Sequence, residues 1–278
     1  MKKTTLITGC SSGIGKAAAR LFASRGWNVV AAVGQPEGGA GLKRLDNVLV
    51  AHLDALDRDS IDQAIEAGIG RFGRIDALIN NPGHGRYGMF EAIPREKIHE
   101  QFDVTLFGVM GVTRALLPHF RANGQGLIIN TSSGAGIFTL PMTSLYCASR
   151  LALEGFSEAL ARELAPQNIA VKMVLPHGGA AGVENPARRG DGELPRRDYD
   201  DFVRRTNAAF AAMSAARAVS AADVALALFE AATDGTQRLR YLVGADGGGA
   251  GRDGAAATAR GARTTSRKRV PARNEAAV

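Results

Sequence analysis

The chain has 278 residues, of which 45% are hydrophobic and 22% charged, a composition that suits one large globular α/β domain with a proper core. Its apolar runs fall far short of the ~20 residues that cross a bilayer, and the amino-terminal residues lead straight into a predicted strand, so we expect a cytoplasmic protein without a signal peptide or membrane contact. The formal net charge is +7, but seven basic and only two acidic residues lie in 250–278, so the rest of the chain gives no reason to expect nucleic-acid binding.

The first predicted elements are a strand, a glycine-rich loop and a helix. Thr4–Ile7 is short and apolar, and Lys16–Ala23 is a strong helix former. The loop between them lets the backbone approach a phosphate closely and directs the free amides of the helix at it. No Lys-Ser/Thr pair follows Gly15, which favours a dinucleotide over ATP or GTP, although a tight turn with close packing would also need glycines. The candidate cofactor-binding residues here are Gly9, Ser11, Ser12, Gly13, Ile14 and Gly15.

The second strand, Trp27–Val33, ends where a dinucleotide site usually sets its preference. An acid at this point bonds the ribose 2′-hydroxyl of NAD, and an arginine nearby accepts the 2′-phosphate of NADP. Val33 and Gly34 carry neither signal, so the choice between NAD and NADP stays open, and Gly34 is a candidate cofactor-binding residue by its place alone. Lys43 and Arg44 are possible phosphate partners, and surface solvation explains them equally well.

The next elements alternate in the same way. Asn47–Leu53 is a third strand, and Asp54 after it either meets an adenine edge or belongs to a polar loop. A helix is expected from Ser60 to Phe72, and a fourth strand at Arg74–Asn80. This alternation predicts a Rossmann-type doubly wound parallel sheet of about seven strands, with helices on both faces, in a single domain.

The remaining elements extend this pattern as far as residue 249, and a disordered basic tail is expected over 250–278. A lid or long loop is expected over 180–200, between the sixth strand and the last two helices. The predicted elements are a helical region at Arg95–Arg121 perturbed near Pro118, a strand at Gln125–Thr131, a helix at Thr143–Ala165, a strand at Ala170–Leu175, helices at Tyr199–Met213 and Ala221–Ala232 with Ser220 as N-cap, and a strand at Arg240–Val243.

Three side chains around the fifth strand suggest proton transfer. Tyr146 and Arg150 are four residues apart on one predicted helix and so share a face, and Ser133 lies in the loop that leads to this helix. A fixed cation stabilises a phenolate, and a serine hydroxyl can hold a carbonyl or alcohol oxygen. Beside a nicotinamide, this set would interconvert carbonyls and alcohols. Taken alone, Tyr146 would be read as core packing.

These motifs together resemble the short-chain dehydrogenase/reductase family over about residues 3–245. The resemblance rests on TGCSSGIG, on NNPG, on a serine thirteen residues before Tyr146, and on YCASR. The segments LYCASRLALEGFSEAL and FDVTLFGVMGVTRALLP look most like the branch that acts on steroids, retinol and other apolar alcohols or ketones.

The resemblance implies a role for each matching residue. Tyr146 would be the acid–base group, Ser133 would orient the substrate, and Thr8 to Gly15 would hold the pyrophosphate of NAD or NADP. It also implies a homo-oligomer, a dimer or tetramer, built through the helices after strands four and five. Further cofactor contacts are implied for Asp54 near the adenine, for Asn80 and Gly83 beside the adenosine ribose, and for Pro176 to Gly179, with Pro176 and Gly178 facing the nicotinamide.

The sequence departs from the family's pattern at positions that matter for catalysis. Arg150 stands where the family has lysine, Thr105 where it has the asparagine of a water relay, and Pro82 where NNAG has alanine. Arginine keeps the charge but cannot shuttle protons, and a threonine would hold a water less well. Two hypotheses follow: an oxidoreductase impaired by Arg150 and Thr105, or a protein that binds the cofactor without chemistry. The histidines show no metal-ligand spacing, so no metal site is predicted.

Overall fold

The computed structural model describes residues 2–83, 85–134, 139, 141–176, 180–181, 188–189, 199–216 and 219–244. These residues belong to one compact unit, Met1–Asp246. The predicted basic tail, 250–278, lies outside the described residues, as does most of the predicted lid at 180–200.

Seven parallel strands form one sheet at the centre of this unit, as the sequence predicts. Each crossover returns the chain to the same edge, so all the loops that follow the strands gather at the carboxyl edge of the sheet. Across the sheet the order is β11 (Arg240–Val243), β7 (Ile169–Pro176), β6 (Gly126–Thr131), β4 (Ala77–Asn80), β1 (Thr4–Ile7), β2 (Asn28–Val33) and β3 (Val48–His52).

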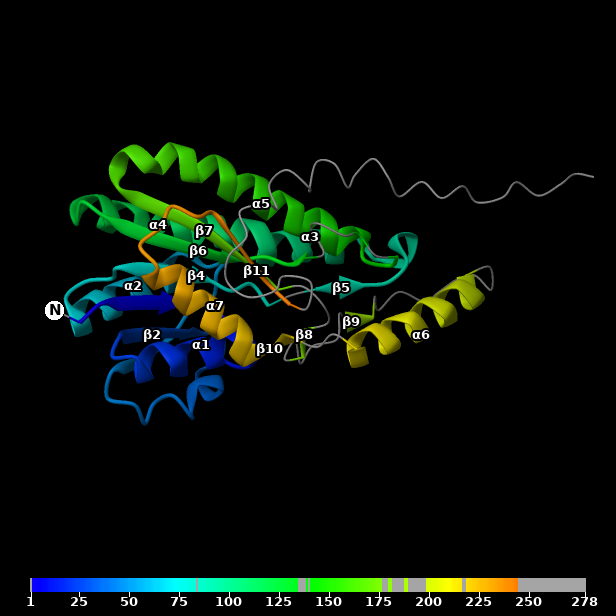
Figure 1. Cartoon of the computed structure of the whole chain (residues 1–278), viewed down its shortest axis with the longest axis horizontal. Coiled ribbons are helices and arrows are strands. Elements are labelled where there is room, and N and C mark those ends of the chain that lie inside the picture. The colour runs from blue at the N-terminus through cyan, green and yellow to red at the C-terminus, as the bar shows by residue number, and fades with distance from the viewer. Residues whose placement is uncertain are drawn as a thin grey trace, which may run out of the picture. The chain divides into compact units, whose positions relative to one another are not determined.

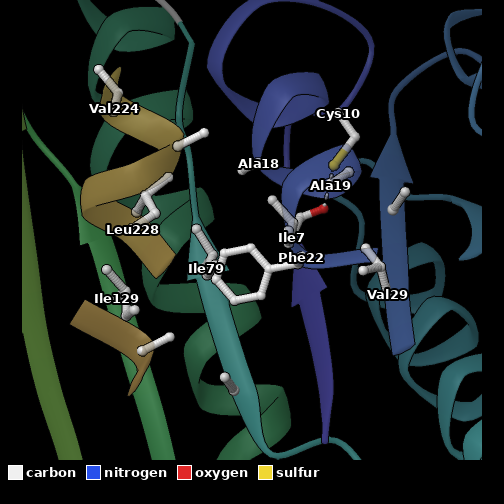
Figure 2. Packing of buried hydrophobic residues seen from close by; sticks show 14 of the residues in the cluster. Ile7, Cys10, Ala18, Ala19, Phe22, Val29, Ile79, Ile129, Val224 and Leu228 are labelled. Atoms are coloured by element: carbon white, nitrogen blue, oxygen red, sulfur yellow. Dashed lines mark hydrogen bonds between the residues drawn. The ribbon is translucent and has the colours of Figure 1, made fainter. Parts of the chain in front are cut away.

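Helices cover both faces of the sheet (Figure 1). One face packs against α1 (Gly13–Ser24) and α7 (Ala221–Thr233), and the other against α2 (Arg58–Phe72), α4 (Gly108–Ala122) and α5 (Ser144–Leu164). Figure 2 shows the first of these cores, where the fully buried ring of Phe22 from α1 lies among Ile79 from β4 and Leu228 from α7. The predicted doubly wound fold is therefore confirmed.

Further elements, most of them short, complete the unit. They lie mainly between β4 and α4 and between β7 and α7. They are the 3-10 turns η1 (Pro36–Gly39), η2 (Phe90–Ala92) and η5 (Ala165–Gln167), the π turn η3 (Asp103–Phe107), the helices α3 (Arg95–Phe102) and α6 (Asp200–Ala216), and the two-residue strands β5 (Arg86–Tyr87), β8 (Ala180–Ala181), β9 (Arg188–Arg189) and β10 (Val219–Ser220).

Helix α2 begins two residues earlier than predicted. Asp57 is its N-cap, and the Asp57 carboxylate accepts a hydrogen bond from the Asp59 amide at 3.0 Å. The Ser60 hydroxyl is not free to start the helix, because it accepts a hydrogen bond from the Asp54 amide at 2.9 Å.

The helical region that follows is interrupted at a different place from the one predicted. Pro118 lies inside α4, which continues to Ala122. The interruption is the π turn, where the Gly108 amide bonds the Asp103 carbonyl, five residues earlier. Gly108 packs closely there, because a Cβ on it would lie 2.9 Å from the Ala55 Cβ. The wide turn places Thr105 in the interior.

Candidate active site

The glycine-rich loop after β1 is bonded to the carboxyl ends of β4 and β2, the strands on either side of β1. The Thr8 amide donates to the Ile79 carbonyl of β4 at 2.9 Å, and the Cys10 amide donates to the Ala32 carbonyl of β2 at 3.0 Å. Gly9 has a φ of +69°, in the left-handed region that favours glycine. A Cβ on Gly15 would lie 2.2 Å from the Gly9 carbonyl oxygen, so α1 can pass this close to the turn only with a glycine there.

The loop fits a pyrophosphate group. Ser12 is the N-cap of α1 but makes no side-chain capping bond, so its hydroxyl does not occupy the amides of the first turn. Those amides and the positive end of the helix form an anion-binding arrangement. Gly13 has a φ of +51°, and Ile14 packs partly against the core. Ser11 is covered by the next loop, because a Cβ on Gly38 would lie 2.7 Å from the Ser11 hydroxyl.

Three other predicted cofactor residues lie at the exposed carboxyl edge. Gly34 and Gly83 are exposed, and nothing lies within 4 Å of the position where either would carry a Cβ. Asp54 is also exposed, and its carboxylate accepts a hydrogen bond from the Leu56 amide at 2.9 Å. Pro176 ends β7 and is buried, whereas Gly178 lies outside the described residues.

Asn80 is placed differently from these residues. Its side chain is buried and donates to the Asn130 amide oxygen at 2.9 Å and to the Thr113 hydroxyl at 3.2 Å. The amide therefore ties β4 to β6 and α4. The neighbouring Asn81, which the sequence analysis did not single out, contacts the glycine turn instead: its amide donates to the Thr8 hydroxyl at 2.9 Å.

Tyr146 and Arg150 lie together on the first two turns of α5. The guanidinium carbon of Arg150 is 5.0 Å from the centre of the half-buried Tyr146 ring. Arg150 is itself 4% exposed. One terminal nitrogen donates to the Thr131 carbonyl at 3.1 Å and the other to the Pro82 carbonyl at 2.8 Å. The planar guanidinium group of Arg150 thus links α5 to the end of β6 and to the loop after β4. Two of the departures from the family's motifs, Arg150 and Pro82, are in direct contact.

Ser133 and Thr105, the other two predicted catalytic residues, lie on two different segments. Ser133 is two residues beyond the end of β6 and is half-buried. Thr105 is fully buried in the π turn, where its hydroxyl accepts a hydrogen bond from the Gln101 side chain at 2.9 Å. Sequence analysis missed Gln101, and the only signal was its position four residues before Thr105 on the same helical face.

The described residues offer little other chemistry. Both cysteines are free and buried, and burial raises the pKa of the Cys10 thiol far above its ordinary range, so this group stays protonated. Within the described ranges, no cluster of three or more His, Cys, Asp or Glu side chains could hold a metal ion. Nor does any described helix have the length and apolar character to span a membrane.

Comparisons with known proteins agree with this geometry. The family described as short chain dehydrogenase matches residues 3–191. A protein of Bacteroides thetaiotaomicron named 3-ketodihydrosphingosine reductase is 37% identical over 200 residues, which are 72% of this chain and 72% of that protein. A crystal structure of a short-chain dehydrogenase from Streptomyces avermitilis has a TM-score of 0.75 at 31% identity, covering 88% of this chain and 89% of that one. A 3-ketoacyl-(acyl-carrier-protein) reductase from Brucella melitensis, complexed with NADH, has a TM-score of 0.71 at 28% identity, covering 87% and 96%.

A parallel sheet of this order, with a glycine turn between its first strand β1 and the helix α1, defines a dinucleotide-dependent enzyme fold. The chain belongs to the short-chain dehydrogenase family. It is an oxidoreductase of the short-chain dehydrogenase type that uses NAD or NADP.

Proposed function

We propose that the protein interconverts an alcohol and a ketone or aldehyde on a small or apolar substrate, with Tyr146 as the acid–base group. The observation that carries this proposal is the Tyr146–Arg150 pair on α5, beside the end of β6. The phenol is half-buried and has a buried cation against its ring. A positioned tyrosine hydroxyl is one of the side-chain groups that serve as general acid and base in enzymes.

Each of the other residues supports one task in this reaction. The backbone of Gly9, Gly13 and Gly15 would hold the pyrophosphate of the cofactor, whose nicotinamide would supply or accept the hydride. During reduction, the Tyr146 hydroxyl would give its proton to the substrate oxygen, and the Ser133 hydroxyl would hold that oxygen. Gly34, Gly83 and Asp54, at the open edge, are proposed to meet the adenosine half, together with the backbone around Asn80.

Arg150 and Thr105 are proposed to lower the rate compared with a family member that has lysine and asparagine there. Both terminal nitrogens of Arg150 are engaged by carbonyls, and a guanidinium does not release a proton at neutral pH. The Thr105 hydroxyl is fully buried and engaged by Gln101. These two observations also favour a second candidate function, a protein that binds the cofactor without turning over a substrate.

Fluorescence titration with NADH and NADPH in parallel is the experiment that tests the cofactor site first. Saturable binding of either is expected. The ligand that binds more tightly gives the preference between NAD and NADP, which the sequence at Val33 and Gly34 leaves open. A screen of alcohols and ketones with the preferred cofactor then separates the two candidates. If the natural chain shows no turnover and the double variant Arg150→Lys, Thr105→Asn gains it, the binding function is supported.

The first prediction concerns Tyr146 itself. We expect Tyr146→Phe to abolish turnover while leaving cofactor affinity within a few-fold, because the change removes one hydroxyl and keeps the ring that packs on Arg150. Initial rates and the same cofactor titration measure both effects. Turnover equal to that of the unchanged chain would refute the acid–base role of Tyr146.

An apolar substrate is supported by two exposed aromatic side chains on the segments that follow β4 and β7. Phe90, just after β5, is 58% exposed, and Phe202 on α6 is 41% exposed. The two segments are linked, because the Tyr87 hydroxyl donates to the Asn207 side chain at 2.5 Å. The name of the Bacteroides thetaiotaomicron relative, a ketone reductase, agrees with this substrate class.

We also propose that the protein forms a homo-oligomer in the cytoplasm. Two free, buried cysteines suit a reducing compartment. Met110 on α4 and Phe156 on α5 are apolar and only partly buried, as is Phe102 at the end of α3. Phe107, in the π turn between α3 and α4, is 55% exposed. We expect light scattering to give the mass of a dimer or tetramer, and Phe107→Lys to shift that mass toward the monomer. A monomer in the unchanged chain would refute the oligomer.

A further inference from the structure

One buried amide joins three segments around Tyr146. Gln101, the penultimate residue of α3, has no exposed surface. Its side-chain oxygen accepts a hydrogen bond from the Arg86 amide of β5 at 2.9 Å. Its side-chain nitrogen donates to the Thr105 hydroxyl at 2.9 Å and to the Ser149 hydroxyl of α5 at 3.1 Å. These three bonds, which we call the Gln101 bridge, join residues far apart in the chain.

The bridge reaches Tyr146 from two sides. The Ser149 hydroxyl, which accepts from Gln101, donates in turn to the Tyr146 backbone carbonyl at 2.8 Å. On the other side, Gly85 precedes the residue that Gln101 holds, and a Cβ on Gly85 would lie 3.1 Å from two carbons of the Tyr146 ring. Gln101 therefore fixes both the helical turn that carries the ring and the segment on which the ring packs.

Only a glutamine-like side chain satisfies these partners. Arg86 offers an N–H, so the partner must be an acceptor, and this fixes which way the amide faces. The two amide hydrogens then point to the Thr105 and Ser149 oxygens. A glutamate could not donate either bond in its charged form, and a leucine or methionine would leave the Arg86 amide without this acceptor.

We propose that Gln101 is a positioning residue that keeps the Tyr146 side chain where catalysis needs it, through Ser149 and the Gly85–Arg86 segment. This inference rests on the proposed function, in which Tyr146 is the acid–base group. The three bonds of the Gln101 bridge go to the Arg86 amide and to the Thr105 and Ser149 hydroxyls, and not to the glycine turn, so the bridge acts on Tyr146 and not on the cofactor. Errors of about 1 Å in such a group are enough to cost catalysis heavily.

The test uses the full chain with Gln101→Met, which keeps the length of the side chain and removes all three bonds. We expect kcat to fall by roughly 10- to 100-fold, while KM for the cofactor stays within about twofold. Ser149→Ala, which removes only the link to the Tyr146 carbonyl, is expected to reproduce part of the loss. Gln101→Met should lower kcat by a smaller factor in the Ser149→Ala variant than in the unchanged chain, because both changes act on Tyr146.

Tyr241→Phe is the matched control for a loss of stability alone. The Tyr241 hydroxyl on β11 donates to the carboxylate of Asp234, the C-cap residue of α7, and neither residue belongs to the Gln101 bridge. This variant should lower the melting temperature without lowering kcat. The proposal is overturned if Gln101→Met leaves kcat unchanged, if its effect adds fully to that of Ser149→Ala, or if Tyr241→Phe lowers kcat equally.

Hydrogen–deuterium exchange gives a readout that does not depend on turnover. The amide of Arg86 donates to Gln101, so its exchange should accelerate in Gln101→Met and stay slow in Tyr241→Phe. If the unchanged chain turns over no alcohol or ketone, the proposed function fails, and faster exchange in Gln101→Met would still establish the bridge. Unchanged exchange there would refute the bridge even in an active enzyme.

Discussion

At the scale of single residues, Gly15 and Gly70 show how differently two glycines in helices behave. A Cβ on Gly15 would collide with the Gly9 backbone at 2.2 Å, whereas nothing lies within 4 Å of a Cβ on Gly70, which is exposed in α2. A clash with backbone cannot be relieved by turning a side chain. Gly15→Ala must therefore move the turn itself.

We expect Gly15→Ala to weaken NADH or NADPH binding by at least tenfold and to destabilise the chain. Gly70→Ala, the same chemical change in open space, should stabilise it by about 0.5–1 kcal/mol, since alanine restricts the unfolded chain. Cofactor titration and urea unfolding measure the two effects. Equal cofactor affinity in both variants would contradict the close approach described for Gly15.

Arg150 and Asn80 show which contacts of single residues could be predicted from the sequence and which could not. The pair of Tyr146 and Arg150 follows from a spacing of four on one helix, and the structure brings the two side chains together. The bonds from Arg150 to two carbonyls could not be foreseen, because they depend on where the ends of β6 and β4 lie in space. The same holds for the inward side chain of Asn80, whose partners come from β6 and α4.

At the scale of elements, helix starts were predicted best where the cap is local. Ser220 caps α7 as predicted, and its hydroxyl accepts from the Asp223 amide at 3.1 Å while the Asp223 carboxylate accepts from the Ser220 amide at 3.1 Å. Such a reciprocal cap can be read from four consecutive residues. The π turn at Asp103–Phe107 cannot, because it depends on how α3, α4 and α5 pack.

Ser220→Ala is expected to lower the free energy of unfolding by about 1 kcal/mol, because it removes the capping bond of α7. Ser12→Ala is the matched change at the N-cap of α1, where the side chain makes no capping bond, and it should cost much less in the absence of cofactor. Urea unfolding of the two variants measures both losses in the free energy of unfolding. Equal losses would mean that the hydroxyl of Ser220 does not stabilise α7.

At the scale of the whole molecule, the stability of the fold depends on pH through the exposed residue Asp234, whose carboxylate bonds the buried side chains of Lys172 and Tyr241. Burial alone would raise the pKa of the Asp234 carboxyl, but hydrogen bonds from Lys172, Tyr241 and Thr236 outweigh it and hold this pKa well below its ordinary value of 3.8. A carboxyl whose pKa is lowered by folding stabilises the folded chain above its unfolded pKa. That contribution is lost as the pH falls toward the folded value.

We therefore expect the free energy of unfolding to decline as the pH drops below about 4. Asp234→Asn should be less stable at neutral pH, because Lys172 is only 3% exposed and would lose its charged partner, and its stability should fall less steeply in acid. Asp62→Asn, in an exposed pair with Arg58, should keep the slope of the unchanged chain. Urea unfolding between pH 3 and pH 7 measures these slopes, and an unchanged slope in Asp234→Asn would contradict the assignment.

The order of strands in the sheet has a consequence for how the protein is made. After β1, the strands β2 and β3 are added on one side, and β4, β6, β7 and β11 are added in turn on the other. No strand has to be inserted between two that are already paired. A chain leaving the ribosome can therefore assemble its sheet in the order of synthesis, and each half-made sheet has an edge ready for the strand that emerges next.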